Sequence, residues 1–550
     1  MADVSKFVFK PDNITVNVRD NTARTNINNE TSARQQADNT LQTAINNEAT
    51  ARQNADNALQ TAINNISSQL SSLNNVIKPE DYGAVGDGTT NDTTAIQNCL
   101  NAAHSERKIV LFTQTYKVTT RITIYGGTHI IGYGAKIKYT HNPSSSSPLN
   151  YFLFDMSNQS NICVEGLSFE GSGYETTQYK LSYTIGGSGC NNIEIKHCNF
   201  DKHGGLSCIY FIASNNIRVD FCQITDYTYG GVMFVEVCNN VYVGHCIILD
   251  GHHIGSSSNR NRYAISLNGY YTDPPSSGQR SVGDNLIAEE NFIKDSTGFW
   301  EGIDAHGGTN IKVLNNTIIG CAVPIAIFTS AAGKFAVDKA DIIGNLCLVT
   351  ESNVVSESIA AYFSVMSGNN IKVIDNFFSA TLITNTRYGG VFLEGTGIMV
   401  QNNQITNVGQ HAFHIGSERN TINCIIKDNL LRLQSTINTA LFHYGYDTSP
   451  IPSIYVYACN NIIDGNKLYS VKSGRTSSNT QLRLRDNEYY GVPTIDEYTG
   501  LYSDIGNSSI LSNLLGINGE FIRNTSPTAG GYFGWVRVSG AWKGYGVIQS

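Results

Sequence analysis

The chain has 550 residues, of which 15% are charged, and a net charge of −8 at pH 7. This length predicts more than one domain, and without a basic stripe no nucleic-acid partner is expected. No apolar run reaches the roughly 18 residues of a membrane-spanning helix, so membrane insertion is not predicted. The N-terminus lacks the apolar core of a signal peptide, which predicts synthesis in a cytoplasm.

The first element in chain order is a short mixed segment, residues 1–22, predicted to attach the protein to a larger assembly. Residues 23–77 follow, with two near copies of one phrase at 28–45 and 46–63. Both copies place apolar residues at helical spacing without Pro or Gly: Ala37, Leu41, Ile45, Ala55, Leu59 and Ile63. The stripe is narrow and best buried against copies of itself, so a parallel trimeric coiled coil is predicted. A flexible Asn/Gln-rich linker is the alternative.

Residues 78–108 form the next unit. Pro79 is expected to end the long helix, and the stretch 81–97 reads DYGAVGDGTTNDTTAIQ. A short second helix is predicted after Asn91 or Asp92 as its cap, with Ile96, Cys99 and Leu100 on its apolar side.

Residues 109–480 carry an internal repeat. Its phrase reads CNNIEIKHC at 190–198 and returns at 214–222, 238–246, 283–291, 308–316 and 368–376, with looser copies from 395 and 420. Apolar and polar residues alternate within each copy, which is typical of a strand. A repeat of this length that cannot bury its apolar side alone predicts an all-β solenoid.

One position of each repeat holds a Cys or an Asn, which predicts an internal ladder with hydrogen-bonded Asn side chains and Cys packed as a small apolar residue. Its members are Cys198, Cys222, Cys246, Asn291, Asn316, Asn376 and Asn403. The 12 cysteines contain no CxxC pair, so reduced buried thiols are predicted, with disulfides or a metal as the alternative. No metal and no cofactor is predicted.

Residues 79–480 resemble the pectate-lyase-like superfamily of right-handed parallel β-helices. The stretch 81–97 is similar to the entry motif of that superfamily, which includes many phage tailspikes, and the resemblance implies that the short helix closes the open end of the coil. The predicted fold is thus mainly β: a right-handed parallel β-helix after a trimeric coiled coil. Residues 481–550 are predicted to form a small β unit that holds a trimer together or contacts carbohydrate, because exposed Trp and Tyr serve both purposes.

Candidate site residues come from aligning the strands that precede the repeat phrase. This alignment puts Met233 inward with Ile303 and places two columns on the outer wall. One column holds Phe234, Ser266 and Asp304, and the other holds Glu236, Asn268 and His306.

The segment 300–308, WEGIDAHGG, is the richest cluster of chemically active side chains. We predict Glu301 and Asp304 as an acid pair for glycoside hydrolysis, Glu236 as a substitute and His306 as the residue that orients them. Solvated surface acids are the alternative. The predicted substrate contacts are Trp300, Arg262, Tyr263, Asn268, Tyr270 and Phe234.

The same segment resembles the acid-bearing strand of polygalacturonase-like β-helices. The next coil, 322–326, reads AVPIA where that family carries paired acids, so its mechanism does not transfer unchanged. Asp250, His252 and His253 form a second polar cluster, which we interpret as a turn rather than a metal site.

The order of segments resembles a bacteriophage tailspike or appendage protein. The resemblance implies a homotrimer in the virion, joined to the phage tail or baseplate through its N-terminus and acting at the bacterial cell surface. Its partner would be a bacterial surface polysaccharide (capsule, O-antigen or teichoic acid), bound and depolymerised. Hydrolysis is the first hypothesis, and a polysaccharide lyase and a non-catalytic receptor-binding spike are the alternatives.

Overall fold

Two compact units, residues 1–75 and 76–550, make up the chain. The computed structural model describes residues 21–72, 75–139, 151–173, 180–251, 262–269, 282–295, 301–329, 337–349, 362–380, 389–408, 411–416, 421–433, 439–445, 453–464, 468–473, 481–485, 488–490, 504–505, 521–524, 528–539 and 541–549. Most of the predicted attachment segment lies outside these ranges. None of the helices described is long and apolar enough to cross a membrane.

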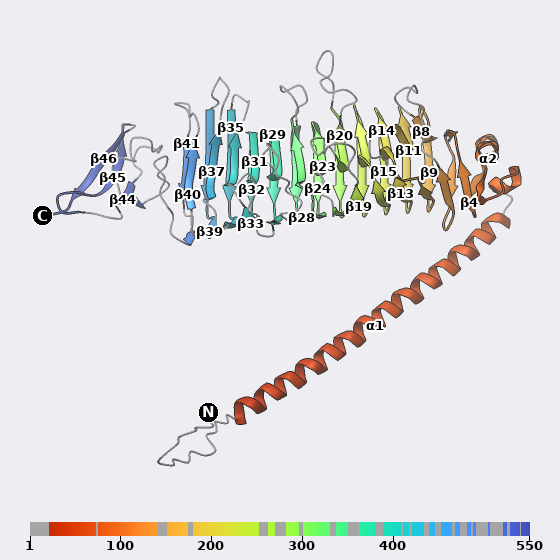
Figure 1. Ribbon diagram of the computed structural model, residues 1–550. Helices are drawn as coiled ribbons and strands as arrows, with labels where there is room; N and C mark the ends of the chain where they lie inside the picture. Colours follow the sequence, from red (N-terminus) through yellow and green to blue (C-terminus); the bar gives the residue numbers. More distant parts are fainter. Residues whose placement is uncertain are drawn as a thin grey trace. The chain divides into compact units, whose positions relative to one another are not determined.

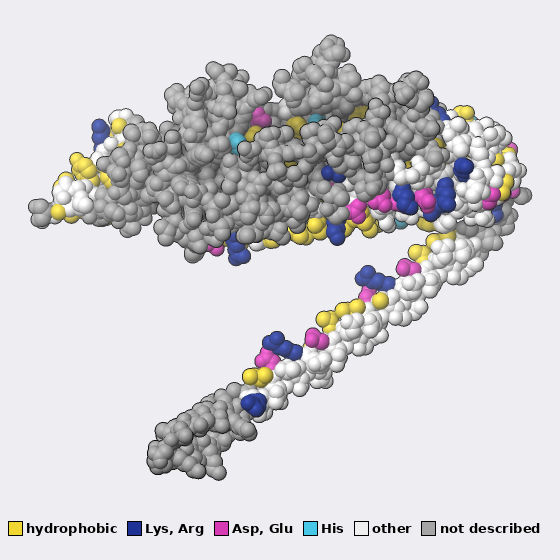
Figure 2. All heavy atoms as spheres, in the orientation of Figure 1, with side chains coloured by type: hydrophobic (Ala, Val, Ile, Leu, Met, Phe, Trp, Pro, Cys, Tyr) yellow, Lys and Arg dark blue, Asp and Glu magenta, His cyan; other side chains and the backbone are white. Residues whose placement is uncertain are grey.

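The first unit contains helix α1 (Asn21–Ser72), so the predicted N-terminal helix is present. Figure 2 shows apolar and charged side chains recurring along it, as the repeated phrase requires. Arg52 pairs with Glu48 one turn earlier, at 2.7 Å. The apolar stripe is uncovered in the single chain, since Leu41 and Leu59 are each 61% exposed. Nothing in one chain tests the trimeric coiled coil.

The second unit is built from coils of three strands each, as in β23 (Glu301–His306), β24 (Gly308–Leu314) and β25 (Thr317–Ile319). Each strand pairs in parallel with the equivalent strand of the coils before and after it. Figure 1 shows these strands side by side in successive coils. The arrangement is a parallel β-helix, consistent with the predicted right-handed coil.

The three strand positions define three faces of the β-helix. Face A consists of β5 (Ile122–Thr123), β8 (Tyr151–Asp155), β11 (Lys180–Ser188), β14 (Gly205–Ile212), β17 (Gly230–Val235), β20 (Tyr263–Gly269), β23, β26 (Val323–Phe328), β31 (Gly389–Thr396), β34 (His411–Gly416), β37 (Thr439–Gly445) and β40 (Leu468–Ser473).

Face B consists of β1 (Val76–Ile77), β3 (Ile109–Leu111), β6 (His129–Ile131), β9 (Ser160–Glu165), β12 (Asn191–Lys196), β15 (Asn215–Asp220), β18 (Asn239–Gly244), β21 (Asp284–Glu289), β24, β27 (Val337–Ile343), β32 (Ile398–Gln401), β35 (Thr421–Lys427), β38 (Ser453–Cys459) and β41 (Gln481–Arg485). The long strand β29 (Tyr362–Ile374) runs through faces A and B and joins them into one sheet.

Face C forms a separate sheet of β2 (Asp87–Asn91), β4 (Thr115–Val118), β7 (Lys136–Tyr139), β10 (Ser168–Glu170), β13 (Asn199–His203), β16 (Gln223–Tyr227), β19 (Ile247–Gly251), β22 (Phe292–Lys294), β25, β28 (Leu346–Val349), β30 (Phe377–Ala380), β33 (Gln404–Val408), β36 (Leu430–Leu433), β39 (Ile462–Asp464) and β42 (Glu488–Tyr490). A further sheet of β43 (Asp504–Ile505), β44 (Phe521–Asn524), β45 (Tyr532–Val538) and β46 (Ala541–Val547) lies where the small β unit is predicted. Its role in a trimer or in sugar contact stays a prediction.

Helix α2 (Thr93–Glu106), which follows the short 3-10 helix η1 (Pro79–Tyr82), packs at the start of the coil. Ile96, Cys99 and Leu100 are fully buried in the same core as the first strands. The side-chain amide of Gln97 accepts from the backbone N–H of Thr123 at 2.7 Å and donates to its carbonyl at 3.0 Å. The helix therefore satisfies backbone groups that would otherwise be left unpaired near the end of the sheet.

The polar ladder is the clearest internal feature of the β-helix. From Asn291 onward each ladder Asn donates its side-chain amide to the next, at 2.9–3.0 Å. The three predicted Cys members are buried at the start of the same column. Three Asn members were not predicted because their coils depart from the repeat phrase: Asn345, Asn429 and Asn461.

We predict that Asn345→Ala destabilises the protein by about 3 kcal/mol, because it removes a buried amide with partners on both sides. Asn345 donates to Val313 O at 2.8 Å and to Asn376 Oδ1 at 2.9 Å, and accepts from the Asn316 N–H at 2.9 Å. The midpoint of thermal unfolding measures the loss. Exposed Asn199 is the control, since Asn199→Ala is expected to cost less than about 0.5 kcal/mol. Equal midpoints for the two variants would contradict a stabilising ladder.

Candidate functional site

The site lies on face A, where strand register sets which side chains meet. Ser266 of β20 pairs with Met233 of β17 on one side and with Asp304 of β23 on the other. The sequence neighbours of Ser266 and Asp304 point into the core, as strand alternation requires. These neighbours are Ile265, Leu267, Ile303 and Ala305. Ser266 and Asp304 therefore stand next to each other on the outer side of adjacent coils.

The predicted register of β17 is wrong by one residue. Val232 pairs with Ile265, so Phe234 faces the core and is fully buried, and it cannot be a substrate contact. Met233, which was expected to face inward, lies outside the main core. The cause is turn length: residues 236–238 link β17 to β18, whereas Gly307 alone links β23 to β24. Glu236 thus lies beyond the end of β17 and outside the Asp304 column.

Glu301 reaches the outer side because the chain bends at Gly302. A Cβ atom on Gly302 would lie 2.6 Å from Pro324 O and 2.8 Å from Ile318 Cγ2, so this position faces the packed interior. Two successive residues, Gly302 and Ile303, therefore face inward, and the flanking acids both face outward. One side-chain oxygen each of Glu301 and Asp304 and one nitrogen of His306 all lie within 4.8 Å of one another.

An imidazole bridges the two acids. His306 Nε2 is 3.0 Å from Asp304 Oδ2 and 3.9 Å from Glu301 Oε2. Side-chain exposure is 21% for His306, 8% for Glu301 and 1% for Asp304. A ligand on the outer wall would therefore meet His306 first, with the carboxylates behind it.

The surroundings change the proton affinities of this cluster. Burial raises the pKa of Asp304, and hydrogen bonding from His306 and Ser266 offsets part of that rise. Burial lowers the pKa of His306, but its interactions with the carboxyl groups of Asp304 and Glu301 outweigh burial and raise the pKa to about 10. The imidazole is therefore a cation at neutral pH and serves as the counter-ion of the two acids.

Rings and an amide hold His306 in place. Its ring lies 4.3 Å from that of Phe328, centroid to centroid, and 6.3 Å from that of Tyr263. The side-chain amide of Asn268 donates to His306 O at 3.1 Å. Tyr263 and Asn268 are thus beside the cluster, as predicted by sequence, and both are buried. Phe328 was missed, although aligning β26 with β23 pairs it with His306.

Arg262 does not lie on the wall. Its guanidinium is buried and donates from Nη1 to Gly251 O at 3.1 Å, so it supports the backbone before β20 rather than a substrate. Two other predicted contacts, Trp300 and Tyr270, lie outside the described residues. Of the second polar cluster only Asp250 is described.

A second apolar cluster lies on face A, apart from the main core. It spans the strands from β8 to β20, and Tyr183 and Tyr210 stack within it at 4.0 Å between ring centroids. Tyr263 is its last member and borders His306. The sequence did not predict this cluster, because an aromatic residue in a strand is equally compatible with a position in the main core. Its members are Phe152, Tyr183, Tyr210, Ile212, Met233, Val235 and Tyr263.

Glu301, Asp304 and His306 offer three atoms of types that hold metal ions. A metal ion bound here would have to displace the proton that the two acids hold on His306. The geometry at neutral pH is therefore that of a buried ion-pair cluster. Paired carboxylates with a fixed counter-ion are suited to proton transfer.

Comparison with known proteins places this site inside a matched region. Residues 74–332 match the family described as rhamnogalacturonase A/epimerase, pectate lyase-like. The match begins just before η1 and extends past β26, so it includes the coil that carries Glu301, Asp304 and His306. No curated protein matches the chain.

Several solved structures are similar to this chain. The Dettilon tailspike protein is 15% identical, with 66% of this chain and 69% of that chain covered and a TM-score of 0.49. A mutant tailspike protein of E. coli bacteriophage HK620 in complex with pentasaccharide is 11% identical, with 87% and 92% covered and a TM-score of 0.49. An exopolygalacturonase from Thermotoga maritima is 12% identical, with 76% and 91% covered and a TM-score of 0.43.

The His306 ion pairs predict a pH-dependent contribution to stability. Because the pKa of about 10 lies above the ordinary value of 6.5, this contribution is fully present below about pH 6.5 and is lost as the pH rises toward 10. We expect the advantage of the wild type over His306→Gln, measured as the difference in thermal unfolding midpoint, to shrink across that range. A difference that stays constant from pH 6 to about pH 10 would show that the imidazole is not held as a cation.

Proposed function

We propose that this protein binds a bacterial surface polysaccharide and cleaves it by glycosidic hydrolysis at the cluster of Glu301, Asp304 and His306. The observation that carries the proposal is the convergence of two carboxyl groups and an imidazole within 4.8 Å on the outer side of one coil. Hydrolysis of a glycoside needs one protonated acid and one ionised carboxylate. The match to a pectate lyase-like family of rhamnogalacturonase and epimerase description supports a carbohydrate substrate.

The two acids differ in the way that this reaction requires. Asp304 is the acid nearer to the imidazole, with 3.0 Å between Asp304 Oδ2 and His306 Nε2, so the proton held on His306 can pass through the Asp304 carboxylate to the leaving oxygen. Glu301 is the ionised partner that attacks the sugar carbon, and the cation on His306 keeps the pair oriented. A sugar reaches both acids over His306, the most exposed member of the three.

The spacing of the acids favours one stereochemical course. Retaining glycosidases hold their carboxyl groups about 5 Å apart, whereas inverting enzymes need about 6.5–9.5 Å to admit a water molecule. One side-chain oxygen of Glu301 and one of Asp304 lie within 4.8 Å of each other, which is nearer to the retaining spacing than to the inverting one. Glu236, the predicted substitute acid, lies beyond the end of β17 and does not share the Asp304 column. We therefore propose a retaining hydrolase.

A polysaccharide lyase is less well supported by this wall. Elimination needs a base, and Tyr263 is the tyrosine beside the cluster. Burial and the charge of Glu301 raise its pKa well above the ordinary value, so the phenol keeps its proton.

We predict that Glu301→Gln and Asp304→Asn each lower the rate of polysaccharide cleavage by about 10² or more, because each removes one half of the acid pair. Binding of the polymer should persist, since neither variant changes the outer rings. Reducing-end release and a sedimentation binding assay measure the two properties. Glu236→Gln is the matched control and should keep full activity.

Normal cleavage by both Glu301→Gln and Asp304→Asn would contradict the site. If the wild type binds the polymer but does not cleave it, the result supports the receptor-binding alternative. An unsaturated uronate product would instead identify a lyase.

The proposal extends to the assembly. The order of segments resembles phage tailspikes, and we propose a homotrimeric spike in the virion, joined through its N-terminal segment to the tail or baseplate. The trimer would bury the stripe of α1, in which Leu41, Ile45, Leu59 and Ile66 are each more than half exposed in the single chain. Leu41 and Leu59 lie on the same side of the helix, five turns apart at about 3.6 residues per turn.

Leu41→Lys together with Leu59→Lys should lower the oligomer mass measured by light scattering, because each chain would bring two ammonium groups into the buried seam. Thr43→Lys together with Thr61→Lys is the matched control on the opposite side of α1, where each hydroxyl bonds only to its own helix. A trimer that survives the leucine changes at the same concentration would show that α1 does not hold the chains together.

A further inference from the structure

A second group of chemically active side chains lies on face B, in the first coils of the β-helix. His129 of β6, Cys163 of β9 and Glu194 of β12 are register partners on three adjacent parallel strands. Glu165 stands two residues after Cys163 and therefore on the same side of the sheet. The buried residues between them, Ile130, Ile162 and Val164, confirm that this side faces outward.

Cys163 is unlike every other cysteine of the chain. All twelve are described and free, and the remaining eleven are buried, as expected for small apolar core residues. Cys163 alone has intermediate exposure, at an outward position between two buried residues. A core-packing role therefore does not account for a thiol at this position.

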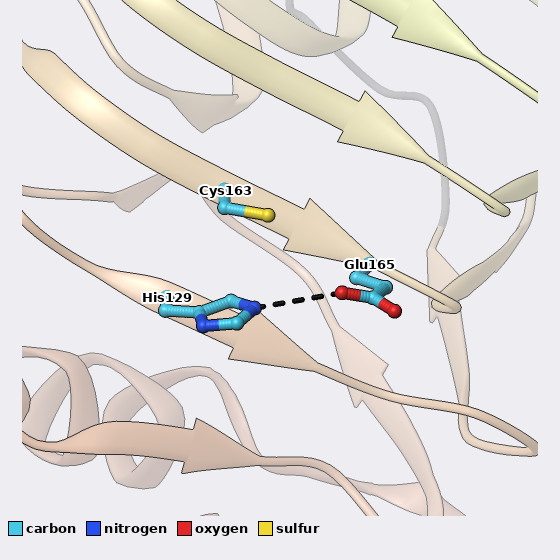
Figure 3. A group of neighbouring side chains, drawn as sticks. All are labelled: His129, Cys163 and Glu165. Atoms are coloured by element: carbon cyan, nitrogen blue, oxygen red, sulfur yellow. Dashed lines mark ion pairs between the residues drawn. The ribbon is translucent and has the colours of Figure 1, made fainter.

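The surrounding atoms converge on this thiol. The nitrogen, sulfur and oxygen that His129, Cys163 and Glu165 can offer lie within 4.8 Å of one another, and Figure 3 shows the three side chains converging from adjacent strands. His129 Nε2 is 3.6 Å from Glu165 Oε2. That nitrogen is shielded from solvent and has no hydrogen-bond partner among the described residues. Glu194 brings a second carboxylate, 3.5 Å from Cys163 Sγ.

We propose that His129, Cys163, Glu165 and Glu194 form a binding site for a divalent cation of the zinc class. Thiolate, imidazole and carboxylate are the ligands that zinc takes in proteins, commonly four in a tetrahedron, and a thiolate selects against hard cations such as Mg²⁺. Binding replaces the thiol proton, which is released to solvent. The metal would link three successive coils, through β6, β9 and β12.

Neighbouring groups fit this role. Tyr133 donates its hydroxyl to Glu165 Oε1 at 2.6 Å and so fixes the carboxylate from outside the ligand set, as outer partners do at metal sites. In the metal-free chain Lys196 Nζ lies 3.1 Å from Glu194 and 3.5 Å from Glu165. The ammonium is then a competing cation, which the incoming metal displaces.

The test uses Co²⁺ as the probe on the full chain, since a thiolate bound to Co²⁺ gives a sulfur-to-metal charge-transfer absorption. We expect one Co²⁺ per chain with this absorption, displaced by Zn²⁺. Cys163→Ser and His129→Gln should abolish it, and both changes are at outward positions of a folded strand. His245→Ala is the matched control. His245 follows β18, farther along the β-helix, and also contacts two carboxylates, Asp220 at 2.8 Å and Glu290 at 3.2 Å, without a thiol.

Lys196→Met adds a second, independent readout. Removal of the competing ammonium should tighten Co²⁺ binding several-fold, and unchanged affinity would place the metal elsewhere. Absence of the charge-transfer absorption in the wild type, or its persistence in Cys163→Ser, would overturn the proposal. None of these outcomes depends on polysaccharide cleavage, so this site and the proposed hydrolase are tested separately.

Discussion

The parallel stacking of coils in strict register is the constraint on which the rest of the structure depends. Each backbone pairs with the coil before and the coil after it, so side chains at equivalent positions lie in columns along the axis. The column of Asn side chains from Asn291 to Asn461 adds side-chain hydrogen bonds inside the coil. A polar group is tolerated in this core because both neighbours satisfy it.

The same stacking builds the outer sites. Strand alternation alone would place Glu301 and Asp304 on opposite sides of β23, since they are three residues apart. The bend at Gly302 brings both acids outward, and it requires glycine because the interior at this point is filled by Pro324 and Ile318. On face B, register alone aligns His129, Cys163 and Glu194 across three strands. One scaffold thus carries two unrelated clusters of polar side chains.

Much of the fold could be predicted from the sequence, because a repeated phrase reports both the strand period and the coil length. The ladder and the outward direction of Asp304 and His306 followed from it, and a separate repeat at 28–63 predicted the N-terminal helix. The register of β17 did not, since one coil has a longer turn, and the position of Phe234 was therefore wrong. The buried role of Arg262 and the His129–Cys163–Glu165 group depend on contacts between coils, which no local pattern records.

In the proposed mechanism two carboxyl groups on one coil, Glu301 and Asp304, act together on a sugar at a spacing nearer to that of retaining than of inverting glycosidases. The anomeric configuration of the first product, followed by NMR during cleavage of the purified polysaccharide, distinguishes retention from inversion. We expect that the configuration of the cleaved bond is retained. A first product with inverted configuration would contradict it, because inversion requires a second carboxylate farther from Asp304 than Glu301 is.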